Sequence, residues 1–171
     1  MKFLFVCAVV FFCFAHSVYA TEPNLRMTML SESMEHGEAS SVAIISDADV
    51  VYGGLSLNYI HSSEIIGFDN RQTIYPVYVF FGLKAPFRFT PYIESGFDLG
   101  DSLIDDLYNN GEDEESLIDY YYAGGFSLSI DSRTSLQFFA KKYNLKFREY
   151  FMAPTVKNRP ESYGVGLSVR F

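Results

Sequence analysis

Residues 162–171 alternate between large apolar side chains and small or polar ones without a break. Every second position places these large residues on one face: Tyr163, Val165, Leu167, Val169 and Phe171. The opposite face carries Gly164, Gly166, Ser168 and Arg170. A repeat of two residues is typical of a β-strand with one apolar and one polar face. We therefore predict a strand here, with an apolar environment on one side.

The same alternation recurs along the chain. In residues 50–60, Val51, Leu55, Leu57 and Tyr59 share one face, and Tyr52, Gly54, Ser56 and Asn58 share the other. Four further strands are predicted at 73–84, 89–100, 120–130 and 135–147. Two weaker candidates lie at 24–33 and 39–46, so the pattern predicts eight strands in total.

The connections between these strands fall into two kinds. Tight turns follow the second, fourth and sixth strands, around residues 47–49, 85–87 and 131–133. Longer connections span 62–72, 101–116 and 148–160, and only the connection near 35–38 departs from this rule. Short turns at one end and long loops at the other are typical of outer-membrane barrels. We predict an all-β fold, an eight-stranded antiparallel up-and-down transmembrane β-barrel with both termini at the short-turn end.

A barrel follows from the physics of a sheet in hydrocarbon. Unpaired backbone groups in lipid cost several kcal/mol each, so the sheet must close on itself. The apolar faces then contact lipid, and the lumen of eight strands is narrow enough to be filled by side chains. Aromatic residues near strand ends are expected at the membrane interfaces: Tyr59, Tyr75, Phe89, Tyr120, Tyr163 and Phe171. Alternation alone leaves open a soluble β-sandwich or lipocalin-like fold.

The first 20 residues have the pattern of a cleaved secretory signal. Lys2 precedes the apolar run 3–15, and Val18-Tyr19-Ala20 offers a site for signal peptidase. A retained anchor helix would need roughly 20 apolar residues, which this run does not provide. We expect a signal peptide at 1–20 and one barrel domain at 21–171. Cys7 and Cys13 both fall within the signal, so no disulfide is expected in the mature chain.

Composition narrows the classes of partner. Without the signal, 12 basic residues stand against 21 acidic residues, a formal charge of −9, which argues against nucleic acid as a partner. The full chain contains 17 Phe and 13 Tyr but no Trp, a high aromatic content for a small soluble protein. This content favours the membrane interpretation.

The terminal strand also carries a family resemblance. Tyr163, Val165, Leu167, Val169 and Phe171 resemble the C-terminal recognition strand of Gram-negative outer-membrane proteins, which the barrel-assembly machinery reads in that class. In size and strand count the mature chain is similar to the small OmpA/OmpX/OmpW-type barrels. The resemblance implies a monomer in the bacterial outer membrane, with lipid and lipopolysaccharide as its surroundings.

Four charged residues are predicted to form a network in the lumen. Alternation places Glu94, Asp98, Lys141 and Arg170 on inward faces. Because Glu94 and Lys141 lie at similar distances from their turns, we predict that they approach one another. Burial of either charge alone would cost several kcal/mol, so we expect a structural pair. A conducting small-solute channel is the alternative.

Other candidate chemistry is weaker. His61 and Ser63 match the His-x-Ser spacing of small-barrel lipid A deacylases, but residues 73–84 contain no acid to orient the histidine. The loop 101–116 holds seven acids and fits the calcium-loop pattern poorly, with Tyr108 and Leu117 at ligand positions. We therefore predict no enzyme activity, no cofactor and no dedicated metal site. The loops are expected to interact with lipopolysaccharide, cations or external partners, and a lipid A acyl hydrolase remains the alternative.

Overall fold

The computed structural model describes residues 24–62, 73–100, 119–147 and 156–171, and almost all of them lie in strands. The strands are β1 (Asn24–Met34), β2 (Gly37–Asp47), β3 (Val51–Ser62), β4 (Thr73–Ile74), β5 (Val77–Lys84), β6 (Phe89–Asp98), β7 (Tyr120–Ser129), β8 (Thr134–Phe147), β9 (Val156–Asn158) and β10 (Glu161–Arg170). All eight predicted strands are present, including the two weaker ones at the start of the mature chain.

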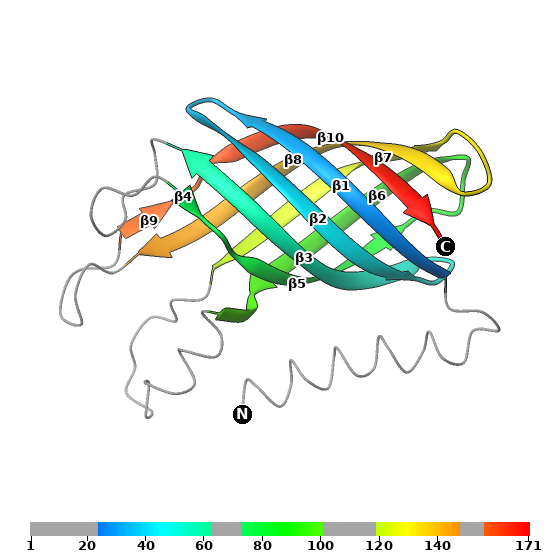
Figure 1. Cartoon of the computed structure of the whole chain (residues 1–171), viewed down its shortest axis with the longest axis horizontal. Helices are drawn as coiled ribbons and strands as arrows, with labels where there is room; N and C mark the ends of the chain where they lie inside the picture. The colour runs from blue at the N-terminus through cyan, green and yellow to red at the C-terminus, as the bar shows by residue number, and fades with distance from the viewer. Residues whose placement is uncertain (1–23, 63–72, 101–118, 148–155) are drawn as a thin grey trace.

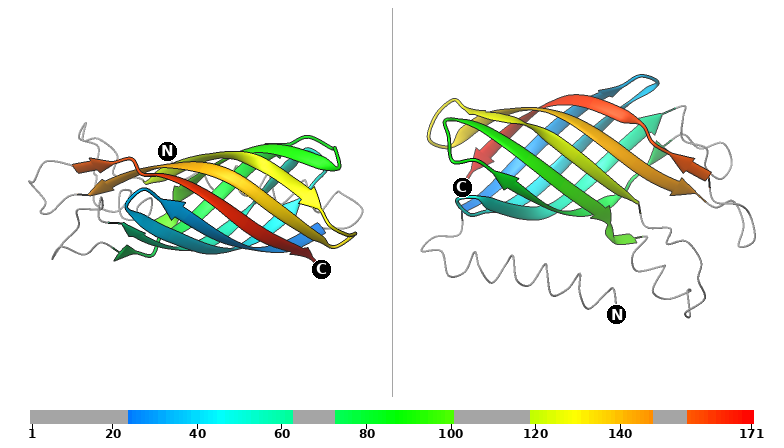
Figure 2. Two further views of the ribbon diagram at one scale, coloured as in Figure 1. Left: turned by 90° about the horizontal axis from the view of Figure 1, so that it is seen from above. Right: turned by 180° about the vertical axis from the view of Figure 1, so that it is seen from behind.

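The sheet closes on itself. All pairings are antiparallel: consecutive strands pair from β1 to β3 and from β5 to β8, β3 also pairs with β4 and β5, β8 with β9, and β10 with both β8 and β1. The register at the closing seam runs from Arg26 opposite Arg170 to Met34 opposite Ser162. Figures 1 and 2 show the tilted strands wrapped around one lumen. The predicted fold class is confirmed, and closure satisfies the backbone groups that a sheet edge would expose.

Prolines divide two of the eight barrel strands into segments. β4 and β5 together form the predicted strand 73–84, interrupted at Tyr75 and Pro76. Proline lacks the backbone donor that a ladder needs. The register nevertheless continues across the gap, and the Asn58 N–H donates to the Pro76 carbonyl at 3.0 Å. β9 and β10 are related in the same way across Pro160, whose carbonyl accepts the Tyr143 N–H at 3.0 Å.

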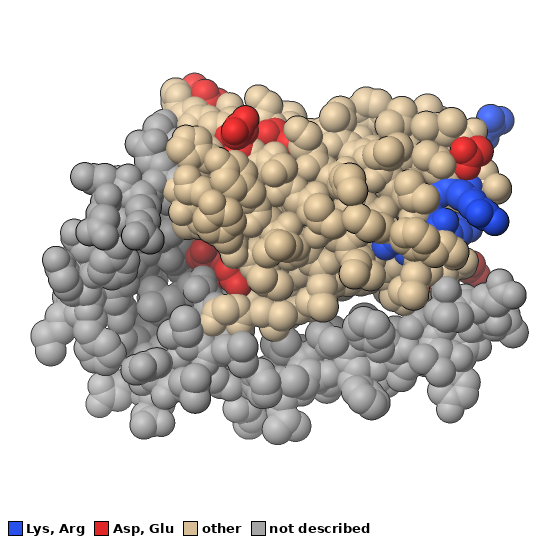
Figure 3. Space-filling view, viewed as in Figure 1, with Lys and Arg blue, Asp and Glu red and all other residues tan. Residues whose placement is uncertain are grey.

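The inward and outward faces agree with the predicted alternation. On β3, Tyr52, Ser56 and Asn58 are buried, whereas Val51, Leu55 and Leu57 are exposed. On β10, Ser168 is buried and the predicted apolar set is exposed: Tyr163, Val165, Leu167, Val169 and Phe171. In Figure 3 the middle of the visible surface is free of charged residues, and cations gather at the end where the C-terminus lies. A soluble monomer rarely exposes so continuous an apolar surface.

Aromatic side chains on the outer face differ between the two ends of the barrel. Towards the long loops they are mostly tyrosines, including the contacting pairs Tyr59–Tyr75 and Tyr120–Tyr122, whose ring centroids lie 5.7 and 5.4 Å apart. Towards the short turns they are phenylalanines, and Phe126 stacks on Phe89 at 4.5 Å and on Phe138 at 5.1 Å. Phe171 is also exposed at this end. Two such girdles are what a membrane barrel requires at its interfaces.

The ends of the barrel follow the predicted arrangement of turns. The connections β2–β3, β5–β6 and β7–β8 are short and lie at the end where β1 begins and β10 finishes (Figure 1). The Phe171 N–H donates to the Leu25 carbonyl at 3.0 Å at this end. No helix among the described residues is long and apolar enough to cross a membrane. The predicted signal peptide and the acidic loop 101–116 lie outside the described residues.

Candidate functional site

The lumen contains a buried ion pair whose two residues come from β8 and β1, the strands on either side of β10. The Lys141 ammonium on β8 donates to Glu32 Oε1 on β1 at 2.7 Å, and both side chains are almost fully buried. The hydroxyls of Tyr143 and Ser162 each donate to Glu32 Oε2 at 2.7 Å. Both carboxylate oxygens are therefore hydrogen-bonded, which offsets much of the cost of burying the charge.

Aromatic rings surround the ammonium. Lys141 Nζ lies 4.7 Å from the centre of the Tyr121 ring, 5.3 Å from that of Tyr143 and 5.4 Å from that of Phe139. Tyr78 packs edge-on against Tyr121, with ring centres 5.0 Å apart. Cation–π contacts of this kind are favourable when the cation is desolvated. We call this layer the plug: Glu32, Tyr78, Tyr121, Phe139, Lys141 and Tyr143.

The prediction of a Glu94–Lys141 ion pair is wrong in its choice of partner. The register places Glu94 opposite Ala123 and Ala123 opposite Lys141, so the two charges do face the lumen at one level. Lys141 instead pairs with Glu32. Glu32 lies two strands away on one side, across β10, and Glu94 lies two strands away on the other side, across β7. In a closed sheet Lys141 has strands on both sides, and the spacing from the turns pointed only to the acid on β6.

The other predicted lumen charges do not form one network. Glu94 accepts a hydrogen bond from the Tyr121 hydroxyl at 2.7 Å and is half-buried. Asp98 is buried towards the loop end of β6, where its carboxylate accepts the Gly100 N–H at 2.8 Å. Arg170 lies at the opposite end, by the short turns. The four residues therefore occupy three levels of the barrel.

Asp47 organises the short-turn end of the lumen. It is the last residue of β2, and three cationic side chains from three other strands lie close to its buried carboxylate. Arg26 Nε lies 3.4 Å and Arg170 Nη2 3.9 Å from Oδ2, while Lys84 Nζ donates to Oδ1. The expected inward position of Arg170 agrees with this contact. One carboxylate thus stands among three cations.

The β7–β8 turn beside this cluster is held by Asp131. Its Oδ1 accepts the backbone N–H groups of Arg133 and Thr134, each at 2.7 Å. These bonds favour the ionised carboxylate and lower the pKa of Asp131 below its ordinary value. The turn therefore rests on a charged side chain at neutral pH.

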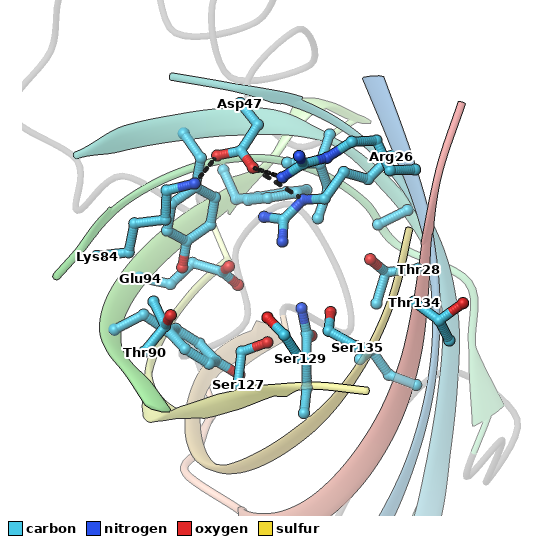
Figure 4. A pocket seen from close by; sticks show the side chains of 18 of the residues that line it. Arg26, Thr28, Asp47, Lys84, Thr90, Glu94, Ser127, Ser129, Thr134 and Ser135 are labelled. Atoms are coloured by element: carbon cyan, nitrogen blue, oxygen red, sulfur yellow. Dashed lines mark hydrogen bonds and ion pairs between the residues drawn. The ribbon is translucent and has the colours of Figure 1, made fainter. Parts of the chain in front are cut away.

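A cavity of about 160 Å³ lies between the Asp47 cluster and the plug. We call it the vestibule; it is open at the short turns and ends at Tyr121 and Lys141. Figure 4 shows Arg26, Asp47 and Lys84 on one side and a row of hydroxyls on the other: Thr90, Ser127, Ser129, Thr134 and Ser135. Side chains thus fill only part of the lumen, because small residues line its turn-side half.

Two outward-facing features bear on the other predictions. The His61 ring lies against Tyr59 with centroids 6.5 Å apart, and its Nδ1 is 2.7 Å from the Thr73 hydroxyl. Its proposed catalytic partner Ser63 lies outside the described residues.

Within the described ranges, no group of three or more His, Cys, Asp or Glu side chains could hold a metal ion. A role for Tyr163, Val165, Leu167, Val169 and Phe171 as an assembly signal stays a prediction.

Sequence reasoning missed Glu32 and Asp47, two buried acids of the lumen. Both lie in the strands with the weakest alternation, and Asp47 was interpreted as part of a turn. A signal was present. In residues 24–33, Arg26, Thr28 and Glu32 share one face and Met27 and Met29 share the other, so alternation places Glu32 inside.

Comparison with known proteins supports the fold alone. No family model and no curated protein sequence matches the chain. The crystal structure of Neisserial surface protein A (NspA) matches with a TM-score of 0.55 and 10% sequence identity. The match covers 86% of this chain and 95% of that chain. The chain is therefore similar in architecture to a bacterial surface protein, at an identity that carries no residue roles across.

Proposed function

We propose that the protein is an integral outer-membrane barrel without enzyme activity, which presents its long loops outside the cell and does not conduct solutes. The observation that carries this proposal is the pairing of an apolar outer face with a sealed lumen. Leu57, Ile93 and Val165 are exposed on the outside, while Glu32 and Lys141 are buried within. The exposed apolar side chains on the outside are suited to contact with the hydrocarbon of a membrane.

The plug supports the absence of a channel. Tyr78, Tyr121 and Tyr143 are fully buried and lie across the lumen beside the Glu32–Lys141 pair. Ile60 and Leu145 are fully buried on the loop side of this layer. A solute would have to displace a hydrogen-bonded ion pair and then an apolar layer. The NspA fold, in a protein that its name places at the surface, agrees with this assignment.

The loops are the parts of the protein that we propose to interact. Three basic residues of the connection 148–160 would meet lipopolysaccharide phosphates: Arg148, Lys157 and Arg159. Only Arg159 has a described side chain, and its Nε donates to Asn144 Oδ1 at 3.3 Å. Outer-membrane barrels carry their longer loops on the extracellular side, which supports an external position for this end of the barrel.

Two measurements on the folded protein test the proposal. Planar bilayers containing the barrel should show no steady conductance, and stable channels would contradict the sealed lumen. Vesicles with lipopolysaccharide should slow tryptic cleavage in the connection 148–160, compared with vesicles of phospholipid alone. A variant with Arg148, Lys157 and Arg159 all replaced by Gln should lose lipopolysaccharide binding, and equal binding by this variant would refute the role of the loop.

A further inference from the structure

The two ends of the vestibule carry opposite surplus charge. At the mouth, Arg26, Lys84 and Arg170 surround the single carboxylate of Asp47. At the inner end, Glu94 lines the cavity together with Lys141, whose ammonium is bonded to Glu32. The mouth is therefore a site of surplus positive charge and the inner end one of surplus negative charge.

Glu94 is the charged residue at the inner end of the vestibule that remains available to a ligand. It lines the cavity, and the Tyr121 hydroxyl donates to Oε1 at 2.7 Å. Among the described residues it forms no salt bridge, and the ammonium of Lys141 is bonded to Glu32. A carboxylate in a confined, partly dehydrated cavity gains from an additional cation.

The walls also offer unused hydrogen-bond donors. Ser41 Oγ is buried in the cavity wall without a hydrogen-bond partner among the described residues. Arg26 Nε is buried there too, and although it lies 3.4 Å from Asp47 Oδ2 in an ion pair, it makes no hydrogen bond among the described residues. A buried donor without an acceptor is unfavourable, so an acceptor at this position would be bound favourably. Arg26 lies beside the Asp47 cluster, where the surplus charge is already positive. An anionic group suits this side of the cavity.

We propose that the vestibule binds a small zwitterion, with its primary ammonium towards Glu94 and its carboxylate towards Arg26 and Arg170. The volume of about 160 Å³ is large enough to hold several water molecules or a small ligand. The hydroxyls of Ser127, Ser129 and Ser135 line the opposite wall and would hydrogen-bond either end (Figure 4).

Charges at the turn tips do not change this assignment. Asp49, Asp131 and Arg133 lie at the rim of the vestibule and are exposed. Together these three add one negative charge, so the mouth keeps a formal surplus of one positive charge when they are counted with the Asp47 cluster. The vestibule faces the periplasm if the proposed membrane orientation holds, and the binding itself does not depend on that orientation.

Calorimetric titration of the folded barrel in detergent tests the proposal. The probes are glycine, β-alanine and 4-aminobutyrate, each compared with acetate and methylamine, which carry only one of the two charges. At least one zwitterion should bind saturably and about tenfold more tightly than either single-charge probe. Equal binding of acetate would overturn the proposal in favour of a plain anion site, and no saturable binding of any zwitterion would refute it outright.

Three variants separate the two ends of the site. Glu94→Gln should weaken zwitterion binding about tenfold and leave acetate binding unchanged, whereas Arg26→Gln should weaken both. Glu161→Gln, on the outer face, is the matched control and should bind as the parent does. A heat-dependent shift on a gel shows that each variant is folded. Unchanged zwitterion binding by folded Glu94→Gln and Arg26→Gln would overturn the assignment.

Discussion

Lys141 and Glu32 are 109 residues apart in the sequence, yet Nζ and Oε1 lie 2.7 Å apart inside the barrel. The pair spans the seam where β10 joins β1, so it can form only when the sheet is closed. Four strands contribute to the contacts around it: β1, β7, β8 and β10. We expect it to contribute to the stability of the closed barrel.

Lys141→Met should destabilise the folded barrel by about 3–5 kcal/mol, because it leaves the Glu32 carboxylate buried without a cation. The double variant Glu32→Gln/Lys141→Met should lose less than the sum of the two single variants. The measurement is the urea dependence of unfolding from lipid vesicles. Lys142→Met is the control, since Lys142 lies on the outer face in an exposed pair with Glu161 and should cost about 0–1 kcal/mol. Equal losses at residues 141 and 142 would count against the buried pair.

Gly124 and Gly125 are neighbours in the sequence, but they differ in the space available for a side chain. A Cβ at Gly125 would lie 2.2 Å from the Phe138 carbonyl oxygen, whereas a Cβ at Gly124 would meet nothing closer than 3.8 Å. Gly125→Ala should therefore destabilise the barrel by about 1–3 kcal/mol through overpacking, and Gly124→Ala should be nearly neutral. Both are measured in the same urea titration, and a neutral Gly125→Ala would show that β7 and β8 are less closely packed than described.

The lipid contact of the outer face predicts a cost that depends on depth. Leu57 is near the middle of β3 and exposed, and Val51 is exposed at its turn end. Leu57→Arg should destabilise the barrel folded into vesicles by about 2–4 kcal/mol, and Val51→Arg by about 0–1 kcal/mol. If Leu57→Arg folds as well as the parent, water rather than hydrocarbon covers this face.

Asp131 predicts a pH dependence of the β7–β8 turn. Its pKa is lower in the folded protein than its ordinary value of 3.8, because the N–H groups of Arg133 and Thr134 donate to it. Its stabilising contribution is therefore complete above the ordinary pKa and is lost as pH falls through the lowered pKa. The stability difference between the parent and Asp131→Asn should shrink as the pH falls below about 3.8. A stability difference that stays the same at low pH would show that the shape of the Asp131 side chain, and not its charge, causes the effect.

The closed architecture was predictable because alternation and turn length are local properties of the sequence. Each face of β3, β8 and β10 could be assigned by counting residues, and Tyr59 and Phe171 take their expected outward positions. Pairing inside the lumen was not predictable in the same way. Lys141 has an acid two strands away on either side, and only the tilt and register of the closed sheet decide that Glu32 is the partner. The vestibule depends on the combined volumes of inward side chains from all the strands, which no single segment reveals.

The central claim is that hydrocarbon covers the exposed alternate side chains of this barrel. It is tested most directly by diluting the denatured mature chain into phospholipid vesicles and, separately, into buffer without lipid or detergent. Samples from both are then run on a gel with and without boiling. The account predicts a compact, faster-running form that appears only with vesicles and is converted to the slower form by boiling. A folded, monomeric and strand-rich protein in the lipid-free buffer would contradict it.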